Sequence, residues 1–523
     1  MNLFVLSLAV AFALIPTVFT ITPQFHILQQ SSYFNSRFFD YLKGRLKQSS
    51  IVSSIIAFAL AALWLVAPIA AAVCIALTGA VRALHAVYVI TGVKKKLVYT
   101  GRVKRMYFTH ILLIAVIYAL CYIDGFAPFG IFLSALITAF IPFWAMAVNL
   151  ANAPIEHLLK YGYTKSALKI LKNHSPMRII GITGSYGKTS TKHILGRILS
   201  EKYNVTITPG GFNTPMGVVR TIRENLKPDS EIFIVEMGAK KVGDIKEICD
   251  LVHPKDGIIT SIGPQHLNTF GSIENVVSTK FELADEVKKN GGKVYLNLDN
   301  EMIKRKAGEY DSQGYGAYDK SGRLFVENMS CDRNGLKFDA LADGRRISLS
   351  SRLLGTHNVQ NICAAVLMAV DLGLSDKDIA YAVRMLTPIA HRLEMKPFFG
   401  GAVLIDDAYN ANPDGCMRAM EVIESFAPMK RIVVTPGLVE LGEREYECNK
   451  ALGKKAAECA DILAFVGKER SIPLVEGAKE AGADDDRIKV FKTFNDAAEW
   501  LRTVCDSNTA VIFENDLPDN YAK

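Results

Sequence analysis

Long apolar blocks alternate with short basic loops over the first 150 residues of the chain. The blocks span residues 2–21, 51–90, 107–123 and 128–149. Each is long enough to cross the roughly 30 Å hydrocarbon core of a bilayer as a helix that rises about 1.5 Å per residue. The pattern therefore predicts an α-helical transmembrane region at residues 1–150.

The two loops between the first three blocks each hold a cluster of basic residues. They are Arg37, Lys43, Arg45 and Lys47 in the first loop, and Lys94, Lys95, Lys96, Arg102, Lys104 and Arg105 in the second. Basic loops tend to face the cytoplasm, so residues 51–90 are expected to form a helical hairpin that crosses twice. This predicts about five spans in a bacterial inner membrane, with the rest of the chain in the cytoplasm. The alternative is an N-terminal signal peptide followed by one long tilted span at 51–90.

After residue 150 the pattern changes to short apolar runs that alternate with amphipathic segments. The strand-like runs are residues 178–183, 231–238, 256–263, 293–299, 402–410, 431–437, 460–467 and 510–516. Alternating strands and helices form parallel sheets covered by helices, and these sheets bind ligands at the carboxyl ends of their strands. The predicted fold class is an α-helical membrane region followed by α/β domains.

The composition agrees with a chain that combines an apolar N-terminal region with α/β domains. Its 523 residues exceed what one hydrophobic core holds, 50% of them are hydrophobic and 21% are charged. The net charge of +8 lies largely in the two N-terminal loops, which favours a signal for membrane orientation over a nucleic-acid partner. The nine cysteines include no C-x-x-C pair, so neither a structural zinc site nor a disulfide framework is expected.

The most specific motif is the Gly-rich turn GITGSYGKTST at residues 181–191. It follows a strand-like run and precedes an amphipathic segment. A triphosphate needs the backbone N–H groups, the lysine and the hydroxyl that Gly187, Lys188 and Thr189 supply at such a position. The glycines at 181 and 184 depart from the usual phosphate-binding loop, and a turn that only caps a helix is the alternative.

The same turn resembles the ATP loop of the Mur ligase family, and seven further segments match that family's motifs in the same order. They are TPGGFNTPMG (208–217), IVEMGA (234–239), ITSIGPQHLNTFGS (259–272), STKFELA (278–284), GTHNVQN (355–361), HRLE (391–394) and IDDAYNANP (405–413). The resemblance covers roughly residues 155–520. It implies a linker at 151–177, a central ATP-binding domain with a parallel sheet at 178–388, and a Rossmann-like C-terminal domain at 389–523.

Such ligases activate a carboxylate as an acyl phosphate with ATP and then join it to an amine. The resemblance implies four catalytic residues, Lys188, Glu236, His266 and Lys280. Thr189, Glu236 and His266 are implied to hold Mg²⁺. Lys280 matches a lysine that the family carbamylates, which turns an ammonium into an acid that holds a second Mg²⁺.

The resemblance also implies which residues contact the substrates. Those expected to bind ATP are Gly184, Ser185, Tyr186, Gly187, Lys188, Thr189, Ser190, Asn361, Arg392, Asp407, Tyr409 and Asn410. Asn213 and Thr214 are expected to contact the acceptor substrate. The Arg392 side chain is implied to clamp the nucleotide charge when the C-terminal domain closes.

Two departures from the family's pattern bear on the substrates. The family's N-terminal uridine-nucleotide-binding domain is replaced by the apolar blocks, and the C-terminus reads AVIFENDLPDNY (510–521) in place of a Lys-Gly-Ser-Arg-Gly type segment. The resemblance is strongest to the branch that adds D-alanyl-D-alanine or another amine to a muramoyl peptide. We therefore expect a cell-wall precursor, nucleotide-linked or lipid-linked, an amino acid or dipeptide, and a bilayer as partners. Ligation of poly-glutamate or folate type and a non-catalytic nucleotide-binding membrane scaffold remain as alternatives.

Overall fold

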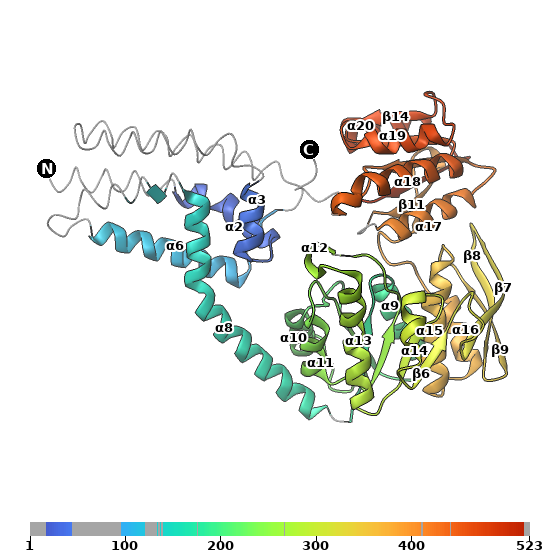
Figure 1. Ribbon diagram of the computed structural model, residues 1–523, viewed down its shortest axis with the longest axis horizontal. Coiled ribbons are helices and arrows are strands. Elements are labelled where there is room, and N and C mark those ends of the chain that lie inside the picture. Colours follow the sequence, from blue (N-terminus) through green and yellow to red (C-terminus); the bar gives the residue numbers. More distant parts are fainter. Residues whose placement is uncertain are drawn as a thin grey trace. The chain divides into compact units, whose positions relative to one another are not determined.

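The computed structural model describes residues 17–43, 96–120, 133, 136–137, 140–174, 176–265, 267–408, 412–439 and 441–516 (Figure 1). The chain divides into two compact units, Met1–Gly162 and Tyr163–Lys523. In the first unit, helices α2 (Thr22–Gln30), α3 (Asn35–Lys43), α6 (Gly101–Leu120) and the start of α8 (Ile141–Asn173) share an apolar core that includes Phe25 and Met106.

The prediction of a multi-pass inner-membrane protein is wrong. Among the residues that the structure describes, α6 alone is long and apolar enough to cross a membrane. The apolar block at 128–149 does not end as a separate span, because from Ile141 it continues into the 33-residue helix α8, which carries Glu156 and Lys160. The block at 51–90 and most of the block at 2–21 lie outside the described residues.

The second unit begins with a sheet that, in its described residues, has nine strands in the order β2-β3-β1-β4-β5-β6-β7-β8-β9. The parallel strands are β1 (Arg178–Thr183), β2 (Val205–Ile207), β3 (Ile232–Glu236), β4 (Asp256–Ile259), β5 (Val294–Asn297) and β6 (Ser312–Tyr315). An antiparallel extension follows, made of β7 (Leu324–Asp332), β8 (Gly335–Ala342) and β9 (Arg345–Ser351). Strand β1 lies between β3 and β4, so the loops that leave these three strands meet at one edge.

Helices cover both faces of this sheet (Figure 1). One face packs against α9 (Lys188–Leu199), α15 (His357–Asp371) and α16 (Asp376–Arg384). The other packs against α10 (Pro215–Glu224), α11 (Asp244–Val252), α13 (Ile273–Lys289) and α14 (Glu301–Ala307), and the short α12 (Leu267–Phe270) precedes α13. Consecutive strand residues such as Ile234 and Val235 point into opposite cores, which is why the strands read as continuous apolar runs.

A second sheet, with six described strands, follows in the order β10-β11-β15-β12-β13-β14. Its strands are β10 (Glu394–Pro397), β11 (Val403–Asp407), β12 (Lys430–Thr435), β13 (Ile462–Val466), β14 (Ile488–Phe491) and β15 (Thr509–Glu514). Its helices are α17 (Pro413–Glu424), α18 (Glu445–Cys459), α19 (Ser471–Glu480) and α20 (Phe494–Val504), with 3-10 turns at Phe399–Gly401 and Gly442–Arg444. All pairings are parallel except β10 with β11, as in doubly wound folds.

Candidate active site

The Gly-rich turn links β1 to α9 and requires glycine at two positions. Gly187 has φ +80°, and a Cβ there would lie 2.7 Å from Asn361 Oδ1. Gly184 has φ +153°, and a Cβ there would collide with the Thr260 hydroxyl. Only glycine adopts these conformations without strain while neighbouring groups approach so closely. The turn therefore leaves the N-terminus of α9 open for an anion.

The turn is fastened to the segment that follows β4. The Ser185 backbone N–H donates to Ser261 O at 2.6 Å, and its hydroxyl donates to Gly263 O at 3.0 Å. The Tyr186 hydroxyl donates to Pro264 O at 3.2 Å. These bonds hold the loop in shape before any ligand arrives, which lowers the cost of binding.

Lys188 folds back onto its own turn. Its Nζ donates to Gly184 O at 2.7 Å and to Ser185 O at 2.9 Å. Burial lowers the pKa of Lys188 to about 8; Glu236 opposes this shift, and Arg392 adds to it. The ammonium thus sits in the concavity of the turn on two neutral acceptors, and a phosphate oxygen is a stronger acceptor for it.

Glu236 ends β3 beside this turn, with 1% of its surface exposed. Its Oε1 accepts from Thr189 Oγ1 at 3.2 Å and from Asn213 Nδ2 at 3.0 Å, and its Oε2 pairs with Lys192 Nζ at 2.8 Å. Burial alone raises the pKa of Glu236, but Lys192 and Asn213 outweigh it, so the pKa lies below its usual value. The carboxylate is therefore ionised at neutral pH.

The donor set at Glu236 suits Mg²⁺. No cluster of three or more His, Cys, Asp or Glu side chains is found among the described residues. Mg²⁺ needs no such cluster, since it is commonly bound by one or two carboxylates together with substrate phosphates and water. Glu236 Oε1 and the Thr189 hydroxyl, 3.2 Å apart and next to the Gly-rich turn, would provide the protein's share of such a site.

Lys280 lies on α13 and is 2% exposed, and no hydrogen bond links its amine to any described residue. Burial lowers the pKa of Lys280 to about 7, and Lys188 adds to this shift while Asp244 and Glu282 oppose it. Much of this amine is therefore neutral near pH 7. A neutral amine is the form that reacts with carbon dioxide, so the environment suits a carbamate.

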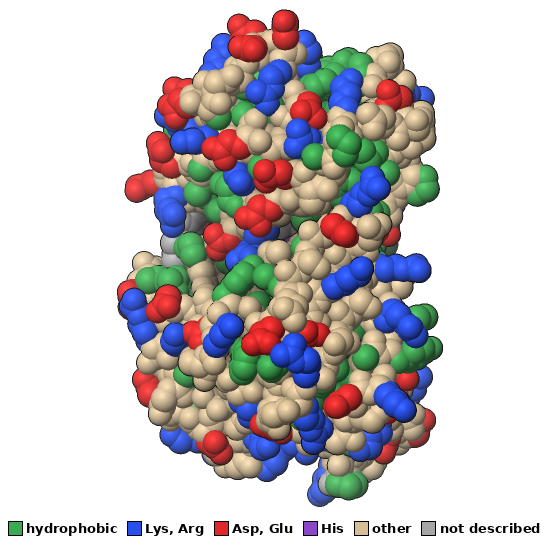
Figure 2. All heavy atoms as spheres, turned by 90° about the vertical axis from the view of Figure 1, so that its right-hand side faces the viewer, with side chains coloured by type: hydrophobic (Ala, Val, Ile, Leu, Met, Phe, Trp, Pro, Cys, Tyr) green, Lys and Arg blue, Asp and Glu red, His purple; other side chains and the backbone are tan. Residues whose placement is uncertain are grey.

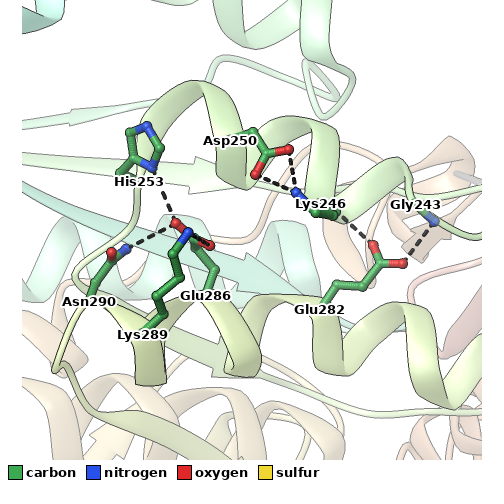
Figure 3. Close-up of polar contacts among 8 residues, drawn as sticks. All are labelled: Gly243, Lys246, Asp250, His253, Glu282, Glu286, Lys289 and Asn290. Atoms are coloured by element: carbon green, nitrogen blue, oxygen red, sulfur yellow. Dashed lines mark hydrogen bonds and ion pairs between the residues drawn. The ribbon is translucent and has the colours of Figure 1, made fainter.

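Glu282, two residues along α13, fixes the helix that carries Lys280 (Figure 3). Its carboxylate accepts from the backbone N–H groups of Gly243 and Lys246, both at 2.8 Å, at the N-terminus of α11. One turn further along, Glu286 accepts from His253 at 3.2 Å, at the other end of α11. A carboxylate at a helix N-terminus stabilises the helix. The two contacts join the second half of α13 to both ends of α11.

A cavity of about 730 Å³ opens beside the turn, with walls from both domains of this unit. Asn361, Arg392 and Asp407 line it together with Tyr186, Gly187 and Ser190. Asn361 is itself positioned, since its Oδ1 accepts from Thr191 Oγ1 at 3.1 Å. The volume falls within the range of cavities that bind small molecules, and these lining residues are among those expected to bind ATP.

Two carboxyl groups of the C-terminal domain, Asp407 and Glu514, line this cavity. Burial raises the pKa of Asp407 to about 6, although it accepts a hydrogen bond from the Leu393 N–H at 3.1 Å. The adjacent Glu514 is fully buried, and burial and Asp407 raise its pKa well above the usual value. The two carboxyls are therefore expected to share a proton at the end of β11 and β15.

Three of the predicted site residues, His266, Tyr409 and Asn410, lie outside the described residues. Thr214 serves as the N-cap of α10, where its hydroxyl accepts from the Gly217 N–H at 3.2 Å. Two polar residues at the site were missed. Lys192 reads in the sequence as a solvated helix lysine, and Glu514 as the end of an apolar run. Charge placed among apolar neighbours was the available signal for Glu514.

Acidic and basic side chains are interspersed over the face drawn in Figure 2. Ion pairs on the antiparallel strands include Arg346 with Asp339 at 2.9 Å and with Glu327 at 2.8 Å. Exposed pairs of this kind contribute little to stability.

Comparison with known proteins agrees with this geometry. A family model of the Mur ligase middle domain matches residues 182–369, and one described as Mur ligase, glutamate ligase domain matches residues 391–514. A UDP-N-acetylmuramoyl-tripeptide–D-alanyl-D-alanine ligase of Mycobacterium bovis is 30% identical over 342 residues, which cover 62% of this chain and 67% of that protein. The ligase of the same name from Bacillus subtilis is 27% identical over 338 residues, covering 64% of this chain and 72% of that protein.

Solved structures give the same result. MurF from Acinetobacter baumannii matches with a TM-score of 0.61 at 25% identity, covering 68% of this chain and 77% of that one. MurF ligase from Thermotoga maritima in complex with ADP matches with a TM-score of 0.60 at 25% identity, covering 68% and 80%. The fold, the phosphate-binding turn and the matches to both domain models lead to one conclusion: the chain belongs to the Mur ligase family and is an ATP-dependent amide-bond ligase.

Proposed function

We propose that this ligase joins D-alanyl-D-alanine to the peptide of a UDP-linked muramoyl tripeptide, with ATP as the energy source. The carrying observation is the contact set of Lys188, Thr189 and Glu236 at the Gly-rich turn, whose residues Tyr186, Gly187 and Ser190 line the cavity. The substrates follow from the names of the relatives, which describe a UDP-N-acetylmuramoyl-tripeptide–D-alanyl-D-alanine ligase.

In the first step, a carboxylate oxygen of the acceptor attacks the γ-phosphorus of ATP, and the bond from that phosphorus to the β,γ-bridging oxygen breaks. ADP leaves and an acyl phosphate forms. The Lys188 ammonium moves from the Gly184 and Ser185 carbonyls to phosphate oxygens and stabilises the charge on the transferred group. Arg392, across the cavity, is assigned the same task from the C-terminal domain.

In the second step, the amine of the incoming dipeptide attacks the carbonyl carbon of the acyl phosphate. The bond from carbon to the bridging oxygen breaks, phosphate leaves, and the amine gives up a proton as the amide forms. Asn213, whose amide contacts Glu236 at 3.0 Å, is assigned to hold the acceptor, with Thr214 beside it. Asn361, Asp407, Tyr409 and Asn410 are assigned to the nucleotide.

Glu236 and the Thr189 hydroxyl would hold Mg²⁺, with His266 as a further ligand. When bound, the ion supplies positive charge against the phosphates. For Lys280 we propose a carbamate, supported by its burial, its lack of a hydrogen-bond partner among the described residues and its pKa of about 7. The carbamate would give the site a second carboxylate-like ligand.

The test is a reaction of the purified chain with ATP, UDP-N-acetylmuramoyl-tripeptide and a panel of amines, with mass spectrometry of the product. We expect ADP and the D-alanyl-D-alanine amide in equal amounts. Lys188→Ala should lose at least about 100-fold in rate, as removal of one pre-organised charge contact commonly does. Lys337→Ala, which removes an exposed lysine of β8, is the matched control and should keep full activity.

Two outcomes would contradict the proposal. Release of ADP without any amide would leave nucleotide hydrolysis as the activity. Preferred use of glutamate as the amine would favour ligation of the poly-glutamate type.

A further inference from the structure

Lys192 forms an ion pair in the interior of the site. It lies on α9, four residues after Lys188, and its side chain is fully buried. Its Nζ pairs with Glu236 Oε2 at 2.8 Å and donates to Gly210 O at 2.6 Å. A buried ammonium costs much free energy unless it is paired, so this lysine is held at one place by two acceptors.

The two carboxylate oxygens of Glu236 have different partners because of this ion pair. Oε2 faces the Lys192 ammonium, whereas Oε1 receives a neutral hydroxyl from Thr189 and a neutral amide from Asn213. The bonds at Oε1 have neutral donors, whereas the bond at Oε2 joins two opposite charges and adds their Coulomb attraction. A cation that approaches the carboxylate will therefore displace the donors at Oε1 and leave Lys192 on Oε2. Lys192 thus decides which oxygen is open and how the carboxylate plane is turned.

The same lysine ties Glu236 to the loop at residues 208–214. Further bonds join the loop to β3 and the residues just after it. They include Glu236 N–H to Thr208 Oγ1 at 3.1 Å, Gly238 N–H to Asn213 O at 2.8 Å and Asn213 Nδ2 to Glu236 Oε1 at 3.0 Å. The bond from Lys192 to Gly210 O crosses the middle of the loop. A movement of the loop therefore reaches the carboxylate directly.

We propose that Lys192 is a positioning residue that presents Glu236 Oε1 to the divalent cation and couples this cation site to the loop at residues 208–214, which carries Asn213. The inference rests on the proposed function for the roles of Glu236 and Asn213. A buried ion pair that only joined α9 to β3 would stabilise the fold. It would not make binding of the metal and of the acceptor depend on the same lysine.

The first experiment measures binding without turnover. Mn²⁺ is titrated into the full chain with ADP, and free Mn²⁺ is followed by electron paramagnetic resonance. Lys192→Met removes the charge at similar length and should weaken Mn²⁺ binding at least about 10-fold. Lys246→Met breaks an exposed pair with Asp250 (Figure 3) and should leave it unchanged. Mn²⁺ affinity of Lys192→Met within two-fold of the parent overturns the proposal.

The second experiment separates positioning from stability. Lys192→Met leaves a buried carboxylate without its cation, and this variant should unfold at a lower temperature. The double variant Lys192→Met with Glu236→Gln buries no charge there and should regain stability while Mn²⁺ binding stays weak. If Lys192→Met does not fold, Lys192→Gln, which can still donate a hydrogen bond but carries no charge, replaces it in the titration, and Mn²⁺ affinity within two-fold of the parent then refutes the positioning role.

In the ligation assay, Lys192→Met should raise KM for Mg²⁺ and for the acceptor at least about 10-fold, and change KM for the amine less than two-fold. A fall in kcat alone, with both KM values unchanged, contradicts the coupling. Should the parent chain form no amide, the proposed function fails, yet the Mn²⁺ titration and the unfolding data still judge Lys192 by themselves.

Discussion

Replacing Lys280 by methionine should make the protein more stable and inactive at once. Burial lowers the pKa of Lys280 from 10.5 to about 7 in the folded chain. One pKa unit corresponds to about 1.4 kcal/mol, so a shift of about three and a half units corresponds to at most about 5 kcal/mol of unfavourable free energy. Methionine fills similar space without an amine to desolvate. We expect Lys280→Met to raise the free energy of unfolding by about 2–5 kcal/mol at pH 7.

The free energy of unfolding should depend on pH in a direction set by the lowered pKa of Lys280. Since the folded pKa lies below the unfolded one, the unfolded parent binds more protons between pH 7 and 10.5, and its free energy of unfolding rises with pH in that window. The advantage of Lys280→Met should therefore be largest at and below pH 7 and shrink toward pH 10. Urea unfolding followed by circular dichroism, in buffer freed of carbon dioxide, measures both ends. A variant less stable than the parent at pH 7, or an advantage that grows with pH, would refute the reasoning.

Three further predictions follow from the same site. Lys280→Ala should be nearly inactive and regain part of its activity with added acetate, which supplies the lost carboxylate. Rescue by an added amine instead would contradict the proposal that Lys280 is carbamylated. Gly187→Ala should weaken ADP binding at least about 10-fold in calorimetry, because φ +80° and the approach of Asn361 leave no room for a Cβ. The control is Gly308→Ala, whose Cβ meets nothing within 4 Å and which should bind ADP normally. Burial raises the pKa of Asp407 to about 6, so the parent protein loses stability as pH rises through 6. Asp407→Asn should therefore raise Tm more at pH 7.5 than at pH 5. An equal gain in Tm at both pH values would contradict this.

Most of the parallel strands could be predicted from the sequence because each is a compact apolar run that ends at a turn, whereas the short strands β2, β6 and β14 were not predicted. The run at 178–183 corresponds to β1, and the run at 256–263 contains β4. The antiparallel strands β7 to β9 were not predicted, since they alternate buried and exposed residues over a partly solvated surface and contain charges such as Glu327 and Lys337. Their pairing depends on neighbours that the local pattern does not reveal.

The N-terminal prediction went wrong for a related reason. Hydrophobicity reports that a segment is removed from water, and packing against other helices satisfies this as well as lipid does. In the described part, Met106 and Val148 belong to one core shared by α6, α8, α2 and α3, while other apolar side chains of α6, such as Phe108 and Ile111, stay exposed. Nothing in the apolar pattern distinguishes such a core from a bilayer.

The site itself was predictable only in part. Glu236 ends an apolar strand and Lys188 begins the helix after the Gly-rich turn, and the structure brings both beside that turn. Lys192 escaped prediction because its partner is 44 residues away, and only the folding of α9 against β3 brings the two together. Long-range pairs of this kind carry no local signal.

The origin of the oxygen in the released phosphate tests the central claim most directly. An acceptor labelled with ¹⁸O in its reacting carboxylate is incubated with ATP, the amine and the purified chain, and the inorganic phosphate is analysed by mass spectrometry. Ligation through an acyl phosphate predicts one ¹⁸O atom in the phosphate for each amide formed. Unlabelled phosphate alongside the amide would contradict the account.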